Sequence, residues 1–296
     1  TIAFNVGTQV SAITSLTFTN ANWNTAQTVT VTAVNDNVVE GAHTQSITHT
    51  ATSADGNYDG ISTTNVTANI TDNDTAGVTI TQTGTTDVTE GGATDSYTVV
   101  LTSQPSSDVT ISFGVGTQVN AVSNLTFTNA NWNSAKTITV SAIDDTVYEG
   151  THSDTITHTI TSGDSNYNGI VIPSITVNIA DNESLPTLQF AATTSNSTDE
   201  SSATRNITVT LSNAASQNIT VTVTDTTGVG AGLAISNIDY ATLSSPFTLT
   251  FSPGTTTQNI SIPVIQDLEF EGNETIQLTL SNPSNSLVSD LVSRIL

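Results

Sequence analysis

An internal repeat with a long period most constrains the fold of this chain. The octapeptide TFTNANWN begins at Thr17 and again at Thr126, 109 positions later, and VGTQV begins at Val6 and again at Val115. A period of this length is too long for a solenoid repeat, but it matches a β-sandwich domain of about 100 residues. The repeat therefore predicts a tandem array of sandwich domains.

The repeat divides the chain into three units. Unit 1 covers residues 1–74 and begins at the counterpart of Thr110, so it lacks its first two strands. Unit 2, residues 75–183, is complete. Unit 3, residues 184–296, is divergent, aligns at a longer shift, and is truncated at its last strand. We expect the missing strands to come from neighbouring repeats of a longer protein, with homopolymer formation by strand complementation as the alternative.

The composition and its patterning indicate an all-β chain. β-Branched residues alternate with polar ones, and long helix-forming apolar runs are absent. Within the sixth strand of unit 2, Ile156, His158 and Ile160 share the inner face and leave a wet face of threonines. The fold class is thus a tandem array of Greek-key, immunoglobulin-like, seven-stranded β-sandwiches. The strands expected in unit 2 are 77–82, 94–102, 108–115, 123–128, 136–143, 153–161 and 170–180.

The charge excludes two classes of direct partner. Only 3 basic residues accompany 26 acidic ones, for a formal net charge of −23. Such a chain repels nucleic acid and anionic bilayers, so we expect neither nucleic-acid binding nor direct membrane insertion. The chain has no cysteine, and no motif of a nucleophilic, metallo- or phosphate-loop enzyme is found, so no catalytic activity is expected.

The acidic residues of unit 2 stand at strand ends. Glu90 follows the first strand, Asp145 and Glu149 follow the fifth, and Asp181 and Glu183 follow the seventh. In a Greek-key sandwich the turn after the fifth strand and the end of the last strand can share one pole, which would crowd these carboxylates. Because few cations neutralise them, Ca²⁺, which takes 6–8 oxygen ligands, is the expected cofactor. Solvated turn residues that only keep the chain soluble are the alternative.

Several motifs together resemble the Calx-beta domain family, whose repeats are abundant in large bacterial surface proteins. They are VTEGG at 88–92, DDTVYEG at 144–150, the acidic terminators at 72–74 and 181–183, and IDY, FSPG and DLEFEGNE in unit 3. The resemblance covers nearly the whole chain and implies Ca²⁺ ligands at an early Glu, at the Asp of a DY pair, at a paired-acid turn followed by Glu, and at a terminal acidic run.

This ligand pattern is carried over unevenly. Unit 2 has no DY pair and has His152 where a further acid would stand, so we expect fewer ions there than the best-endowed members hold. The residues that the resemblance implies as metal ligands are, in unit 2, Glu90, Asp144, Asp145, Glu149, Asp181 and Glu183; in unit 1, Asp36, Glu40, Asp72 and Asp74; and in unit 3, Glu200, Asp239, Asp267, Glu271 and Glu274.

Three further groups of residues are interpreted as structural. Trp23 and Trp132 are expected to cap their sandwiches, and a tyrosine should anchor each loop between the sixth and seventh strands. His49 and His158 are expected to be half-buried and hydrogen-bonded.

The resulting hypothesis is an extracellular, secreted structural protein of a bacterial surface: an adhesin stalk, surface layer, fibre or filament whose domains are made rigid by Ca²⁺. Two alternatives stay open. One is a recognition module that binds glycan or protein, and the other is a set of noncatalytic domains from a large secreted enzyme.

Overall fold

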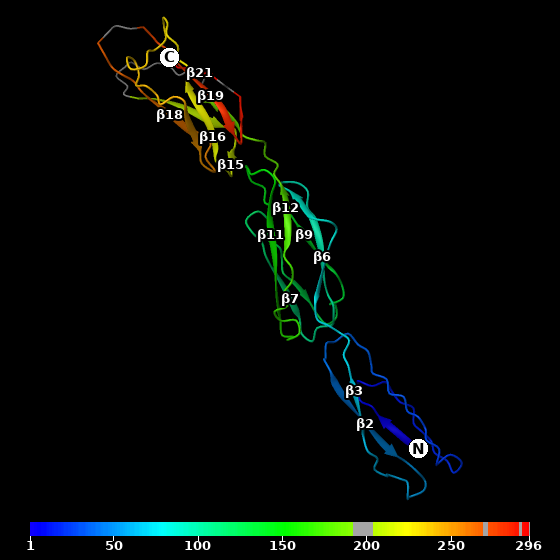
Figure 1. Ribbon diagram of the computed structural model, residues 1–296. Coiled ribbons are helices and arrows are strands. Elements are labelled where there is room, and N and C mark those ends of the chain that lie inside the picture. The colour runs from blue at the N-terminus through cyan, green and yellow to red at the C-terminus, as the bar shows by residue number, and fades with distance from the viewer. Residues whose placement is uncertain (192–203, 269–271, 290–291, 296) are drawn as a thin grey trace.

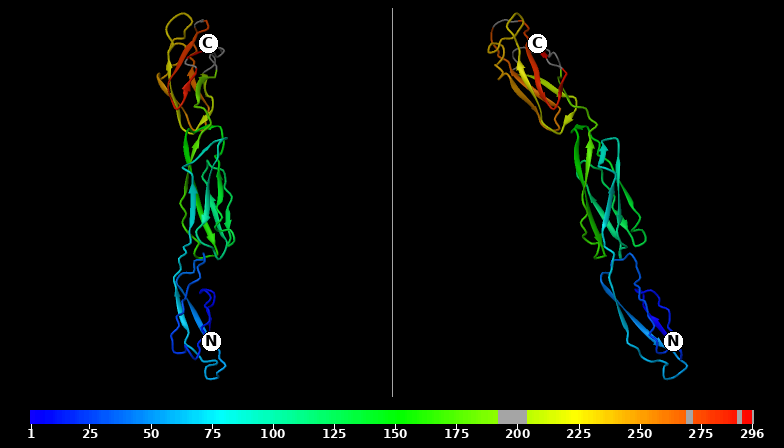
Figure 2. Two further views of the ribbon diagram at one scale, coloured as in Figure 1. Left: turned by 90° about the vertical axis from the view of Figure 1, so that its right-hand side faces the viewer. Right: turned by 45° about the vertical axis from the view of Figure 1, so that its right-hand side comes forward.

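The computed structural model describes residues 1–191, 204–268, 272–289 and 292–295. Three units follow one another along an elongated rod, with the N- and C-terminal ends at opposite extremities (Figures 1 and 2). All regular elements within the described ranges are β-strands, which confirms the all-β prediction. A search of the same ranges for a helix long and apolar enough to span a membrane found none.

Unit 2 is a two-sheet sandwich. Its strands are β4 (Val78–Gln82), β5 (Thr86–Thr89), β6 (Asp95–Leu101), β7 (Val109–Gly114), β8 (Leu125–Phe127), β9 (Lys136–Val140), β10 (Val147–Tyr148), β11 (His152–Ser162) and β12 (Ile175–Ala180). One sheet has the order β4-β6-β9 and the other the order β5-β12-β11-β7-β8. Within both sheets neighbouring strands are antiparallel, except that β5 runs parallel to β12. This is the predicted Greek-key, immunoglobulin-like arrangement.

Strict alternation explains why these segments form strands. Along β12 every second side chain, from Ile175 to Ile179, is buried, and the residues between them are more exposed. Ile156 and Ile160 of β11 join the same core, while Thr157 between them is exposed. The predicted wet threonine face of β11 is therefore confirmed.

The strand prediction for unit 2 was incomplete in two respects. The last strand begins at Ile175 instead of residue 170. The short strands β5 and β10 were not predicted, because four and two residues carry too little alternation to be recognised. Both omitted strands position the acidic residues.

The structural role predicted for the aromatic residues holds in unit 2. Trp132 is partly buried against the core, and Tyr167 is fully buried. The Tyr167 hydroxyl donates to the carbonyl oxygen of Ser103 at 2.6 Å and accepts from the Ser103 amide at 3.0 Å. His158 bonds the Tyr97 hydroxyl and the Pro173 carbonyl, at 3.0 and 2.9 Å.

Unit 1 has a single three-stranded sheet, of order β1-β2-β3. Its strands are β1 (Ile2–Asn5), β2 (His43–Ala51) and β3 (Val66–Ile70). Trp23 is 69% exposed and Tyr58 is 62% exposed, so the predictions of a cap and a loop anchor are wrong for these two residues. In unit 2 the Trp132 backbone bonds Leu101 and the Tyr167 hydroxyl bonds Ser103, whereas the corresponding segment of unit 1 would precede residue 1. His49 packs edge-on against Phe4, and its buried Nδ1 has no hydrogen-bond partner, contrary to the prediction.

Unit 3 forms two four-stranded sheets over its own core. Its strands are β13 (Thr187–Phe190), β14 (Thr204–Leu211), β15 (Ala214–Ala215), β16 (Ile219–Asp225), β17 (Phe247–Phe251), β18 (Thr257–Pro263), β19 (Ile276–Ser284), β20 (Leu287–Val288) and β21 (Val292–Ile295). The sheets have the orders β18-β14-β13-β20 and β17-β16-β19-β21. β21 pairs antiparallel with β19, as β12 pairs with β11 in unit 2.

A short pair of parallel strands joins unit 2 to unit 3. Val147 of β10 lies opposite Ala214 of β15, and Tyr148 lies opposite Ala215. The Ser216 amide donates to the Tyr148 carbonyl at 3.0 Å, and the Tyr148 side chain packs against the core of unit 3.

The junction between units 1 and 2 repeats this contact in shorter form. Val38, the counterpart of Val147, makes a parallel bridge with Gln104, and the Gln104 amide donates to the Asn37 carbonyl at 2.6 Å. The same loop position therefore holds the next unit at both junctions.

Candidate metal centre

The acidic residues of unit 2 meet where β5, β10 and β12 end. Because β5 and β12 are parallel and Thr89 pairs with Ala180, Glu90 and Asp181 leave the sheet at the same edge. The loop that carries β10 returns to this edge. We call the resulting cluster the acidic pole, and its members are Glu90, Asp144, Asp145, Glu149, Asp181 and Glu183.

Glu90 is the buried acid of the pole. Its side chain is only 1% exposed, and its Oε2 has no hydrogen-bond partner. The backbone turns sharply after it, because Gly91 has a φ of +57°, and a Cβ on Gly91 would lie 2.8 Å from Asp144 Oδ1. A buried carboxylate oxygen without a partner is costly, so this site favours a cation.

The loop before β10 is tied to the end of β12. The Asn182 Nδ2 donates to Asp144 Oδ1 at 2.8 Å and to the Glu90 carbonyl at 3.0 Å. Asp145 Oδ1 accepts from the Val147 amide at 2.7 Å, which starts β10. Three segments that are distant in sequence are thereby held at fixed separations.

Asp181 organises the backbone of the pole. Its Oδ2 accepts from the amides of Glu149 and Gly150 at 2.7 and 2.6 Å, and its Oδ1 accepts from the Glu183 amide at 2.9 Å. Burial opposes the charge of Asp181, but the hydrogen bonds from Glu183, Gly150 and Glu149 outweigh it and lower the Asp181 pKa. Asp181 is therefore ionised and already oriented.

Two groups of three donor atoms lie close enough to share an ion. Glu90, Glu149 and His152 form one group, and Glu90, Asp181 and Glu183 form the other; within each group the ligand atoms lie within 4.8 Å of one another. Glu90 belongs to both groups.

Crowding changes the proton affinity of two members. Burial raises the pKa of Glu90, and the charges of Asp181 and Asp145 add to the effect. A side-chain hydrogen bond with Asp181, followed by desolvation, raises the pKa of Glu183 to about 7. The carboxylates of the pole thus repel one another, and a bound cation would relieve this repulsion.

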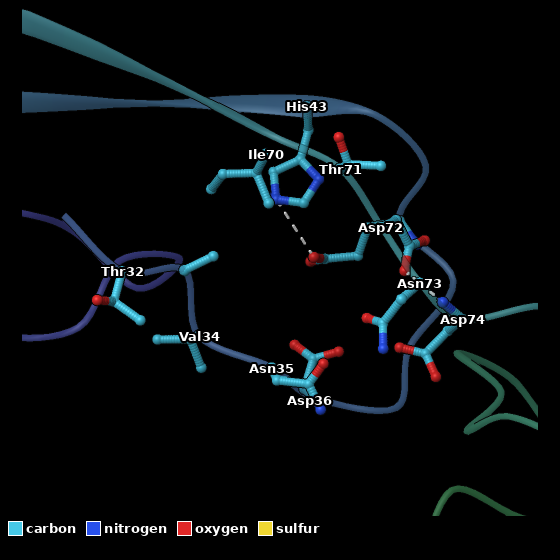
Figure 3. A pocket seen from close by; sticks show the side chains of 12 residues that line it. Thr32, Val34, Asn35, Asp36, His43, Ile70, Thr71, Asp72, Asn73 and Asp74 are labelled. Carbon is cyan, nitrogen blue, oxygen red and sulfur yellow. Dashed lines mark hydrogen bonds and ion pairs between the residues drawn. The ribbon is translucent and has the colours of Figure 1, made fainter.

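Unit 1 repeats most of this arrangement around a pocket. Asp36, Glu40, His43, Asp72 and Asp74 line it, with the carboxylates of the two loops facing each other (Figure 3). The bonds are those found in unit 2: Asp72 Oδ2 accepts from the Glu40 and Gly41 amides at 2.7 Å each, Asp72 Oδ1 from the Asp74 amide at 2.9 Å, and Asp36 Oδ1 from the Val38 amide at 2.9 Å. The position that corresponds to Glu90 would precede residue 1.

Unit 3 presents less of the predicted ligand set. Glu200 and Glu271 lie outside the described residues. Asp239, Asp267 and Glu274 are half-buried, and Asp239 accepts from the Ile235 amide within its own turn. Among the described residues of unit 3, no group of three acidic or histidine donors is close enough to share an ion.

Sequence reasoning missed two contributors to the pole. Gln118 donates from Nε2 to both carboxylate oxygens of Glu149 at 2.8 Å, and in unit 1 Gln9 donates from Nε2 to Oε1 of Glu40 at 2.7 Å. The signal was the glutamine that recurs in VGTQV. His152 was noted only as a missing acid, although its Nε2 lies 3.3 Å from Glu149 Oε2.

The donor set of the pole suits a hard dication. Glu90, Asp181 and Glu183 offer only oxygen atoms as ligands. Oε2 of Glu90 and Oε2 of Glu183 have no hydrogen-bond partner. Ca²⁺ accepts such mixed carboxylate geometries readily and completes its coordination with water or backbone carbonyls.

The Calx-beta domain family model matches residues 9–75, 72–183 and 181–293. The chain belongs to this family and consists of tandem Calx-beta domains, as the motifs indicated.

The search of solved structures returned several similar structures. The apo-form Calx CBD1 domain is 22% identical over 38% of this chain and 95% of that chain, with a TM-score of 0.32. The calcium binding domain CBD12 of CALX1.1 is 14% identical over 72% of this chain and 96% of that chain, with a TM-score of 0.32. A protein of unknown function from Porphyromonas gingivalis W83 is 9% identical over 74% of this chain and 97% of that chain, with a TM-score of 0.28. A search of curated protein sequences gave no match.

Proposed function

We propose that this chain is an extracellular, noncatalytic spacer in which Ca²⁺ bound at the loop clusters makes the rod of Calx-beta domains rigid. The observation that carries the proposal is the position of β10. Asp145 and Glu149 of the acidic pole flank Val147 and Tyr148, which form the strand that pairs with unit 3. The all-oxygen group of Glu90, Asp181 and Glu183 is tied to this strand, because Asp181 accepts from the Glu149 and Gly150 amides that follow it. An ion held by that group would help to fix the strand on which the junction depends.

The charge of the chain supports an extracellular setting. A net charge of −23 suits a compartment with millimolar calcium, where weak sites of Kd about 10⁻⁴ to 10⁻³ M are filled. The proposed partners are neighbouring repeats of the same longer protein. The proposed role is to space and tether in a stalk, layer or fibre.

Calorimetry of the metal-free chain, with and without 10 mM CaCl₂, tests the proposal. One site with the Kd range above would stabilise its unit by roughly 1.4 to 2.7 kcal/mol at that concentration. For a unit of this size, the melting temperature should rise by about 5 °C or more. Glu90→Gln should remove much of this rise for unit 2. An unchanged melting temperature in the wild-type chain would refute calcium binding.

Small-angle scattering tests the mechanical part. With calcium the scattering should fit a single rod of one maximum dimension. After chelation it should fit only a mixture of conformations with different maximum dimensions. If calcium raises the melting temperature but leaves the scattering unchanged, the ion stabilises the units without stiffening the junctions.

A further inference from the structure

We propose that the acidic pole of unit 2 also contains a transition-metal site of the zinc class, formed by Glu90, Glu149 and His152. This position differs from the all-oxygen group of Glu90, Asp181 and Glu183, because it includes a nitrogen donor. The inference shares its location with the proposed function but does not require calcium to bind.

The tautomer of His152 leaves its outer nitrogen available. His152 Nδ1 lies 2.8 Å from the Gly150 carbonyl oxygen, and a carbonyl can only accept, so Nδ1 carries a hydrogen. Nε2 is buried and has no hydrogen-bond partner. A histidine that donates from one ring nitrogen to a carbonyl and turns the other toward carboxylates has the arrangement of a metal ligand.

The separations fit a small tetrahedral ion. His152 Nε2 lies 3.3 Å from Glu149 Oε2 and 3.8 Å from Glu90 Oε1. Ligand atoms bonded to zinc at about 2.0 to 2.2 Å stand roughly 3.3 to 3.6 Å apart at tetrahedral angles. The ligand atoms of Glu90 and Glu149 lie within 4.8 Å of each other, so the carboxylates must draw together around the ion. Calcium, in contrast, takes oxygen ligands at longer distances, and imidazole is a poor donor for it.

The surroundings of the three ligands are already complete. Gln118 holds both oxygens of Glu149 at 2.8 Å, and the Gly150 carbonyl orients His152. Glu90 is buried and keeps Oε2 without a partner. Three protein ligands leave a fourth position for water, as in open zinc sites.

The other units supply an internal comparison. In unit 1, His43 makes the same Nδ1 contact with the Gly41 carbonyl at 2.8 Å and lies 3.5 Å from Glu40. Among the described residues no third donor lies close enough to His43 and Glu40 to share an ion. In unit 3 the position of His152 is taken by Glu274, an oxygen donor. Within the described residues, the histidine-containing triad is therefore complete in unit 2 alone.

Zinc titration of the metal-free full chain, in competition with a fluorescent zinc indicator, tests the site. His152→Gln should weaken the tightest zinc site at least as much as the loss of an outer-shell partner does, about 10- to 100-fold. His43→Gln is the matched control and should leave that site unchanged. Far-UV circular dichroism checks that both variants fold, and His152→Glu, which copies unit 3, serves as a second variant.

Cobalt(II) adds a readout of the ligands themselves. Bound Co²⁺ should give intense visible bands of a four-coordinate ion in the wild-type chain and in His43→Gln, and weak bands in His152→Gln. Zinc should also shift the ¹⁵N resonance of His152 Nε2 more than that of His43. Equal zinc affinity in wild type and in His152→Gln would overturn the inference and leave an ordinary His152–Glu149 ion pair.

The outcomes for the two metals are separable. A calcium-dependent rise in melting temperature that survives His152→Gln, together with zinc binding that this variant does not weaken, would sustain the proposed function and reject the zinc site. Zinc binding that depends on His152, in a chain that calcium does not stabilise, would sustain the zinc site and reject the proposed function.

Discussion

At the scale of single residues, the pole is built by contacts that each fix one atom. Asp181 uses its oxygens on backbone amides, Gln118 holds Glu149, and Gly91 allows the turn that places Glu90. The metal ligands are therefore positioned before any ion arrives, which lowers the entropy that binding must overcome.

Replacing Gly91 by alanine should disturb the pole. Its φ of +57° and the Asp144 oxygen 2.8 Å from the added Cβ predict a loss of stability of roughly 2 kcal/mol or more, with weaker calcium binding. Gly84→Ala is the control, because Gly84 has a φ of +82° but open space around it. It should lose only about 1 to 2 kcal/mol and keep its calcium affinity. Urea unfolding and calcium titration measure both, and equal calcium affinity in the two variants would contradict the placement of Glu90.

The raised pKa of Glu183 gives the metal-free chain an unusual pH dependence. The folded chain holds this proton more tightly than the unfolded chain, whose ordinary Glu value is 4.5. The stability it contributes is complete below about 4.5 and is lost as the pH rises through about 7. The melting temperature of the metal-free wild type should therefore fall between pH 5 and pH 8, relative to Glu183→Gln.

The comparison with Glu183→Gln also removes an opposing contribution. Burial lowers the pKa of His158 from 6.5, which makes stability rise with pH in the window below that value, and both proteins retain His158. Under the proposed function, saturating calcium would bind the ionised Glu183 and should abolish or reverse the difference. Parallel pH profiles for the two metal-free proteins would rule out the raised pKa.

At the scale of elements, the alternation of apolar and polar residues made the long strands predictable, but the short strands β5 and β10 could not be recognised from it. The buried isoleucines of β11 and β12 repeat with period two, whereas β10 is recognisable only by its pairing with another unit. The convergence of Asp145 and Glu149 with Asp181 could be expected from a Greek key, whereas the position of Glu90 beside Asp181 depends on β5, which is too short to be recognised from the sequence. The orientation of His152 was not predicted, although the same contact with the carbonyl two residues earlier recurs between His43 and Gly41 in unit 1.

The loop between β11 and β12 and the corresponding loop between β2 and β3 in unit 1 each contain a tyrosine, so the two can be compared. Tyr167→Phe should cost about 1 to 3 kcal/mol, because the buried Ser103 amide and carbonyl would lose the hydroxyl that satisfies them. Tyr58→Phe changes the counterpart in unit 1, which is 62% exposed, and should change stability by less than about 0.5 kcal/mol. Chemical unfolding monitored by circular dichroism distinguishes the two. Similar losses would show that the loop is not anchored as described.

At the scale of the whole molecule, the junctions decide whether the rod is stiff. Unit 3 is held by the parallel pairing of β10 with β15 and by Tyr148, which packs into its core. Unit 1 is held at the corresponding position by the smaller bridge from Val38 to Gln104. We therefore expect the junction between units 2 and 3 to bend less than the other.

Tyr148→Ala should loosen that junction without unfolding either sandwich. The distribution of single-molecule energy-transfer efficiency between dyes on units 2 and 3 should broaden. The distribution between dyes on units 1 and 2 should not change. Tyr58→Ala serves as the control, since Tyr58 lies in unit 1 and is largely exposed. Identical distributions for wild type and Tyr148→Ala would mean that the backbone pairing alone holds the junction.

The parallel pair across the junction also determines how the rod responds to twisting. A single flexible linker acts as a swivel, but hydrogen-bonded strands fix the azimuth of one sandwich on the next. The Val147 position of the repeat makes a parallel contact at both junctions. We therefore expect torque applied at one end of the rod to be transmitted to the other end. A surface at the tip would then keep a fixed rotational orientation about the rod axis.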